Sequence, residues 1–194
     1  MKLLLARLAF SKDGRNLLWV ILVPVFLLIL VVVLLFSEQS SKPPGSYTVG
    51  PQLSSAVLQY EGAVQEALSE YGLEEHTALV LAIMMQESGG TASMDIMQSS
   101  ESIGLAPNTI TDPMYSIEVG VAHFNKVLEK MQESDVDLDT AIQSYNYGSG
   151  YINFVSKNGG KHSEELAHAF SKQEATKLGW ASYGDPSYVA HVKR

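Results

Sequence analysis

The most constraining feature of the chain is a run of eight apolar residues, ALVLAIMM (78–85), followed at once by the segment QESGG (86–90). A segment this apolar has no polar face to turn toward water, so it predicts a helix that is buried on all sides. The pair Gly89-Gly90 is typical of a helix end, because glycine takes the left-handed conformation there without steric cost. The sequence therefore predicts a fold built around one short core helix.

Glu87 lies in the last turn of this predicted helix. Loss of water and the negative end of the helix dipole both disfavour a charged carboxyl group there, so we expect its pKa to be raised. A carboxyl group that stays protonated near neutral pH is suited to act as a general acid. A solvated helix end is the alternative interpretation, and residues further along the chain decide between the two.

A second apolar segment, residues 17–36, has 20 residues and no charged side chain. This length is enough to cross a hydrocarbon core of about 30 Å. Basic residues precede the segment and few follow it, which predicts a cytoplasmic tail (1–16) and an extracellular C-terminal part. A cleaved signal peptide is the alternative, although the apolar run is longer than usual and no small-residue cleavage motif follows. Residues 37–50, rich in Ser, Pro and Gly, predict a linker to a domain formed by residues 51–194.

Charge and composition exclude several classes of partner. The formal net charge is −8, and because residues 1–16 carry four basic and one acidic side chain, the remainder carries −11. Nucleic acid requires a basic surface, so we expect no nucleic-acid partner. The chain has no cysteine, and its histidines lack the spacing of a metal motif. No glycine-rich phosphate-binding motif occurs either, so we expect no metal and no cofactor.

The spacing of apolar residues after the linker is helical. Residues 53–71 predict one amphipathic helix, Asp112-Pro113 is a typical helix start, and Ser163 begins a further helix with Leu178 facing inward. No segment shows the alternation of a strand, so the predicted fold class is mostly α. Residues 91–111 have no sustained period and predict a long, partly irregular segment, which in compact domains often carries function.

Four segments together carry a resemblance to a known family. They are QESGG (86–90), DIMQSSES (95–102), DPMYSIEVGVAHF (112–124) and AIQSYNYGSGYI (141–152). In this order and spacing they resemble the goose-type and lytic-transglycosylase branch of the lysozyme superfamily. The first two of these segments are most similar to the lysozyme-like muramidase domain of Gram-positive cell-wall hydrolases. The resemblance covers residues 53–192 and implies a lysozyme-like helical domain with a buried central helix.

This resemblance implies cleavage of peptidoglycan glycan strands at the β-1,4 bond from N-acetylmuramic acid to N-acetylglucosamine, with Glu87 as the general acid. Glycosidases commonly pair the acid with a second carboxylate, for which Asp95 and Glu101 are the candidates. We favour Asp95, because it directly precedes the segment that lines the family's cleft. A loop aspartate bonded to its own backbone is the alternative interpretation.

A second carboxylate favours hydrolysis by a muramidase. One alternative is a lytic transglycosylase, which forms a 1,6-anhydro sugar and needs only Glu87. The other is a non-catalytic scaffold that binds peptidoglycan. The expected partners are thus glycan strands and, through one helix, the cytoplasmic membrane. The linker reaches about 45 Å at most, which would keep the domain near the membrane.

Several polar and aromatic residues of the same segments are expected to contact substrate. Hydroxyl and amide groups can bind sugar hydroxyls, and a tyrosine ring can stack on the apolar face of a sugar. In isolation such serines are ordinary turn residues, and for the first of them a structural role at the helix end is the alternative. The expected substrate-binding residues are Ser88, Gln98, Ser99, Ser100, Glu101, Tyr145 and Asn146.

Overall fold

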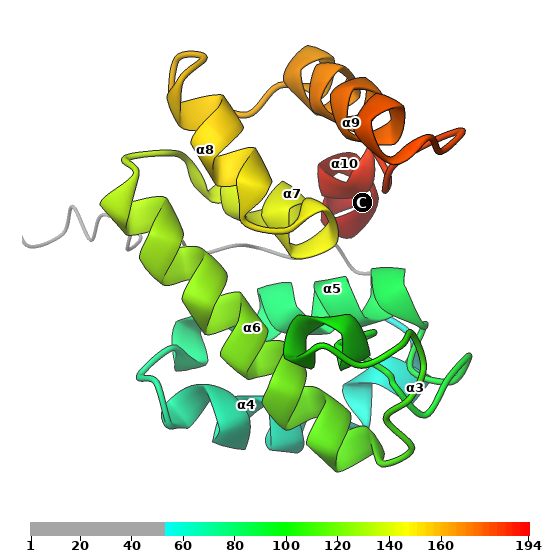
Figure 1. Ribbon diagram of the computed structural model, residues 1–194. Coiled ribbons are helices and arrows are strands. Elements are labelled where there is room, and N and C mark those ends of the chain that lie inside the picture. The colour runs from blue at the N-terminus through cyan, green and yellow to red at the C-terminus, as the bar shows by residue number, and fades with distance from the viewer. Residues whose placement is uncertain (1–52) are drawn as a thin grey trace, which may run out of the picture. The chain divides into compact units, whose positions relative to one another are not determined.

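The computed structural model describes residues 53–194, which form helices and connecting segments without any β-strand (Figure 1). The predicted tail (1–16), membrane helix (17–36) and linker (37–50) lie outside the described residues, as do residues 51 and 52 of the predicted domain. Between residues 53 and 194 no helix is both long and apolar enough to cross a bilayer. The helices are α3 (Ser55–Leu58), α4 (Glu61–Ser69), the 3-10 helix η1 (Glu74–His76), α5 (Thr77–Glu87), the 3-10 helix η2 (Ser100–Ile103), α6 (Pro113–Glu133), α7 (Leu138–Tyr147), α8 (Gly150–Ser156), α9 (Glu164–Leu178) and α10 (Tyr188–Lys193).

Helix α5 is the predicted core helix, and it ends at Glu87 as expected. All residues from Leu79 to Met84 are buried, so the helix has no solvent-facing side along this stretch. Both glycines after it have a positive φ, 62° at Gly89 and 78° at Gly90. A Cβ at Gly90 would also lie 2.6 Å from the carbonyl oxygen of Ala56. The glycine pair therefore ends α5 and lets the chain pass close to α3.

The helices form two groups, and the long helix α6 packs against both (Figure 1). In the first group α3 and α4 pack on α5, and α4 also packs on α6. In the second group α8 packs on α7 and on α9, and α7 packs on α6, while α10 contacts both α5 and α7. The main core surrounds α5, and a smaller aromatic core between α7, α8 and α9 is formed by Tyr147, Tyr151, Val155, Ala167 and Phe170. The C-terminal helix thus joins the two groups of helices.

Helix α6 begins as its sequence predicts, with Asp112 as N-cap and proline in the first turn. The Asp112 Oδ1 accepts a hydrogen bond of 2.9 Å from the backbone N–H of Met114. Further along, a Cβ at Gly120 would lie 2.6 Å from the Cβ of Met97 and 3.0 Å from the Oη of Tyr145. Glycine at this position lets the irregular segment and α7 approach α6 closely.

Two expectations about local structure were wrong. The helix predicted over residues 53–71 is interrupted, because Tyr60 (φ −94°, ψ 0°) separates α3 from α4. The apolar spacing continues across the break, so periodicity alone cannot reveal it. Leu178 does not face inward but is 48% exposed, since α9 ends directly after it at Gly179.

Candidate active site

A cavity of about 370 Å³ lies beside the end of α5. Its lining comes from α5, the irregular segment after it, α6, the end of α7 and the segment before α10. The lining residues are Glu87, Gln98, Ser99, Glu101, Ser102, His123, Tyr145, Asn146, Tyr147, Gly148 and Tyr183. The fold therefore collects side chains that are almost a hundred positions apart in the sequence around one carboxyl group.

The cavity is the middle part of a longer groove. It shares Ser102 and His123 with a hollow of about 380 Å³ on one side. It shares Tyr147 and Tyr183 with a hollow of about 580 Å³ on the other side. A groove that continues on both sides of Glu87 suits an extended polymer better than a small molecule.

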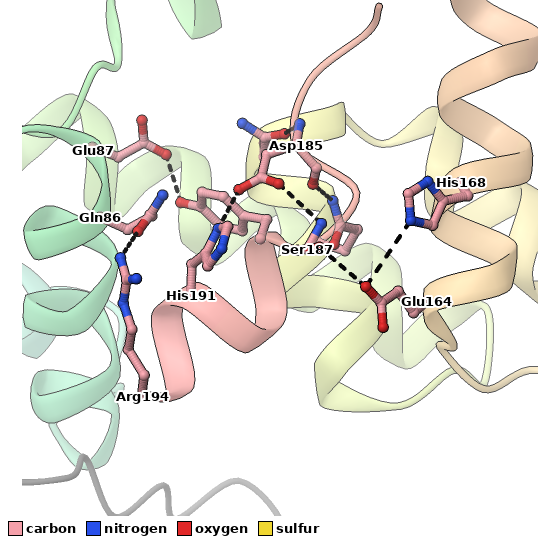
Figure 2. A network of polar contacts seen from close by, with 11 residues as sticks. Gln86, Glu87, Glu164, His168, Asp185, Ser187, His191 and Arg194 are labelled. Atoms are coloured by element: carbon pink, nitrogen blue, oxygen red, sulfur yellow. Dashed lines mark hydrogen bonds and ion pairs between the residues drawn. The ribbon is translucent and has the colours of Figure 1, made fainter.

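Glu87 is half-buried and hydrogen-bonded by a single tyrosine. The residue Tyr188 is only 1% exposed. Its Oη donates a hydrogen bond of 2.5 Å to the Glu87 Oε1 (Figure 2). Burial raises the pKa of Glu87 from 4.5 to about 7. The Tyr188 hydrogen bond opposes this change, and the negative charges of Asp95 and Asp185 add to it. The raised pKa agrees with the expectation from the sequence and leaves the side chain partly protonated at neutral pH.

The segment that carries Tyr188 is fastened to α7 and α5 by polar contacts (Figure 2). The backbone N–H of Asp185 donates to the Oδ1 of Asn146 (2.8 Å), and the Nε2 of Gln143 donates to the Asp185 carbonyl (2.7 Å). The Asp185 Oδ2 lies 2.6 Å from the Nδ1 of His191 on α10. These contacts hold α10 against the wall of the cavity, so that Tyr188 meets Glu87.

Asp95 is completely buried, and its carboxylate is surrounded by hydrogen-bond donors. Its Oδ1 accepts bonds from the Ser99 N–H (2.9 Å) and the Ser116 Oγ (2.7 Å). Its Oδ2 accepts bonds from the N–H (3.1 Å) and the Oγ (2.6 Å) of Ser100. Burial acts to raise the pKa of Asp95, but the hydrogen bonds outweigh it and hold the pKa below its usual value. Asp95 is thus an ionised group that organises the irregular segment and anchors it to α6.

Both tyrosines at the end of α7 turn their hydroxyl groups toward protein. The Oη of Tyr145 donates to the Met97 carbonyl (3.1 Å), and that of Tyr147 donates to the Ala167 carbonyl (3.2 Å). Burial raises the pKa of Tyr147 to about 12 and that of Tyr145 well above its usual value, so both stay neutral. These two side chains offer the cavity ring surface and no free hydroxyl group.

The structure brings together most, though not all, of the residues named from the sequence. Five of them line the cavity beside Glu87: Gln98, Ser99, Glu101, Tyr145 and Asn146. Ser88, Ser100 and Asp95 are not among the lining residues. The Oγ of Ser88 donates to the Ile96 carbonyl (2.7 Å) and accepts from the Gly90 N–H (3.0 Å), which matches the alternative of a structural role.

Sequence reasoning missed four residues of the site: His123, Tyr183, Asp185 and Tyr188. His123 packs edge-on against Tyr145, with ring centroids 5.0 Å apart, and burial lowers its pKa. Tyr188, which donates to Glu87, and Asp185, whose charge raises the Glu87 pKa, belong to a short C-terminal segment without any distinctive pattern of its own. Within the described part of the chain, no group of three or more His, Asp or Glu side chains is placed to hold a metal ion.

Comparisons with known proteins place this chain in a family. A sequence model described as Lysozyme-like matches residues 54–193. The chain is 45% identical to the bifunctional muramidase/DL-endopeptidase CwlT of Bacillus subtilis, over 87% of this chain and 52% of that protein. It is 41% identical to the uncharacterized membrane protein YocA of Bacillus subtilis, over 87% of this chain and 72% of that protein.

A solved structure is also similar. It is a Staphylococcus aureus protein described as similar to a lipoprotein of the NLP/P60 family, with 39% identity and a TM-score of 0.68, over 74% of this chain and 53% of that one. The present chain thus spans about half the length of CwlT and of the solved structure. The match of the family model over nearly all described residues shows that this chain belongs to the lysozyme-like family.

Proposed function

We propose that the chain cleaves peptidoglycan glycan strands at the β-1,4 bond from N-acetylmuramic acid to N-acetylglucosamine, with Glu87 as the general acid. The observation that carries this proposal is a half-buried glutamate with a pKa of about 7 in the middle of an extended groove. Membership of the lysozyme-like family supports it, as does similarity to a relative that is named a muramidase.

The contact with Tyr188 gives the acid its orientation in this proposal. Because Tyr188 donates to the Oε1 of Glu87, a proton on Glu87 belongs on the other oxygen, Oε2. That oxygen would deliver the proton to the glycosidic oxygen of a strand lying in the groove. The ionised Asp95 assists from a distance, since its charge helps to keep the proton on Glu87.

For the second carboxylate the contacts favour Glu101 over Asp95. Asp95 is fully buried, and both of its oxygens are occupied by internal donors. Glu101 is exposed and lines the same cavity as Glu87. We therefore assign to Glu101 the role of positioning the attacking water in a muramidase reaction, and to Asp95 a structural and electrostatic role.

Because both oxygens of Asp95 are occupied, Asp95 cannot activate a water molecule, and this favours a lytic transglycosylase as the second candidate. In that reaction Glu87 serves first as acid and then as base, the sugar's own hydroxyl group attacks, and no carboxylate is needed to activate water. The two reactions leave different ends on the product, a reducing N-acetylmuramic acid or a 1,6-anhydro sugar.

Product analysis tests the proposal. The full chain, the Glu87→Gln variant and the Glu101→Gln variant are incubated with purified peptidoglycan, and released fragments are identified by mass spectrometry. We expect reducing N-acetylmuramic acid ends from the native chain, at least a hundredfold less product from Glu87→Gln, and a marked loss with Glu101→Gln. Anhydro ends, with Glu101→Gln fully active, would assign the transglycosylase reaction. No release from any wall preparation would leave a peptidoglycan-binding scaffold as the better account.

We further propose that residues 17–36 anchor the domain in the cytoplasmic membrane, with residues 1–16 inside and the domain facing the wall. The apolar length and charge bias of the sequence support this, as does the similarity to a relative named a membrane protein. Protease added to intact cells should then digest the domain and spare an epitope placed at the N-terminus.

A further inference from the structure

The hollow of about 580 Å³ that adjoins the Glu87 cavity has a composition of its own. Two helices line it, and each contributes an amide and an ammonium group one helical turn apart. Asn153 lies on α8 and Lys157 directly follows that helix, while α9 contributes Gln173 and Lys177. The rings of Phe154 and Phe170, with centroids 5.4 Å apart, supply an apolar surface between them.

The two lysines set this hollow apart from the rest of the groove. Glu87 and Glu101 are the carboxylates that line the Glu87 cavity. The hollow of about 380 Å³ on the other side of that cavity is lined by two carboxylates, Glu70 and Glu118, and by a single lysine. In the hollow of about 580 Å³ the only carboxylate among the lining residues is Glu174, which lies 2.5 Å from the Nζ of Lys177. In residues 53–194 no carboxylate pairs with Lys157. An otherwise acidic chain thus places an unpaired cation at this end of its groove.

Lysines at the C-terminal ends of helices also stabilise the helix dipole. That effect accounts for a positive charge after α8 and near the end of α9. It does not account for Asn153, which is placed one turn before Lys157 and lines the same hollow. On α9, Gln173 and Lys177 both donate to Glu174, so the amide and ammonium groups of Asn153 and Lys157 are the pair without an internal carboxylate. Paired amide and ammonium donors over an aromatic surface are the groups that bind peptide carbonyls and carboxylates.

We propose that this hollow binds the peptide stem of peptidoglycan through the stem's carboxylates, with Lys157 as the principal cation. The inference rests on the proposed function, because the stem branches from the muramic acid next to the bond that is cleaved. A strand bound at Glu87 must therefore direct its peptide into a neighbouring space. The hollow shares Tyr147 and Tyr183 with the Glu87 cavity, so the peptide can pass directly from one to the other.

Binding measurements on an inactive background test this assignment. The full chain with Glu87→Gln, which leaves the ligand intact, is titrated calorimetrically with three disaccharides: one without peptide, one with a peptide stem, and one with the stem carboxyls amidated. Lys157→Gln is added to this background, and Lys172→Gln, an exposed lysine of α9 outside the hollow, is the matched control. We expect the free-acid stem to bind most tightly and Lys157→Gln to weaken it by about two- to fivefold. Lys172→Gln should have no effect, and neither lysine should matter for the other two ligands.

Each other outcome is decisive. Equal binding with and without the peptide, or equal effects of Lys157→Gln and Lys172→Gln, would overturn the stem site while leaving the proposed function intact. Binding of none of the disaccharides would overturn both proposals. Competition by poly(glycerol phosphate), without preference among the disaccharides, would reassign the hollow to a wall phosphopolymer.

Discussion

Replacing Glu87 by glutamine should stabilise the fold at alkaline pH. The pKa of Glu87 is about 7 in the folded protein and 4.5 for an unperturbed glutamate, a difference of about 2.5 pH units. Each unit corresponds to about 1.4 kcal/mol, so ionising Glu87 costs the folded state about 3 kcal/mol. Because the folded pKa is the higher one, the stabilising effect of the bound proton is complete below about pH 4.5. It is lost as the pH rises through 7.

Glutamine cannot ionise and still accepts the hydrogen bond from Tyr188. We therefore expect Glu87→Gln to match the native stability at pH 4 and to exceed it by about 3 kcal/mol at pH 8. Urea unfolding of residues 51–194 at both values, followed by circular dichroism, measures the difference. Glu133→Gln, at an exposed glutamate at the end of α6, is the control and should show no such dependence on pH. A Glu87→Gln difference that is equal at pH 4 and pH 8 would refute the reasoning, because the stabilisation would then not come from proton linkage.

Three further substitutions test other contacts of the site. Tyr188→Phe removes a hydrogen bond that favours the charged form of Glu87, so the alkaline limb of the pH–activity profile should move upward by about one to two pH units. Asp95→Asn places an amide group among donors that now bind a carboxylate, and should lower the free energy of unfolding by about 2–4 kcal/mol. Gly120→Ala forces a methyl group against neighbouring side chains and should cost about 1–3 kcal/mol.

Matched variants separate these effects from general damage. Tyr151→Phe removes another buried tyrosine hydroxyl, bonded to His162 at 2.9 Å, and should leave the pH profile unmoved. Gly62→Ala has open space around the new methyl group and should be neutral or slightly stabilising, in contrast to Gly120→Ala. An unmoved alkaline limb with Tyr188→Phe, or an unchanged unfolding midpoint with Asp95→Asn, would contradict the roles given to these contacts.

Much of the local structure could be predicted because its signals are local. The apolar run and the glycine pair identified α5 and its end at Glu87, and Asp112-Pro113 and Ser163 marked helix starts that the structure confirms. The raised pKa of Glu87 could be predicted from the same pattern. A carboxyl group at the end of a buried helix is shielded from water whichever elements of the fold cover that helix. The break at Tyr60 left no trace, because the apolar period is the same in one helix or in two.

Only the tertiary structure decided which side chains surround Glu87. Tyr188 lies 101 residues from Glu87, and no local pattern connects the two. Asp95 lies in an irregular part of the segment after α5 and Glu101 in the single 3-10 turn of η2, so no sustained period in the sequence could tell that one turns inward and the other toward the cavity. Periodicity reports the environment of a side chain only where the backbone repeats. In an irregular segment, the orientation of each carboxylate depends on what the rest of the chain packs against it.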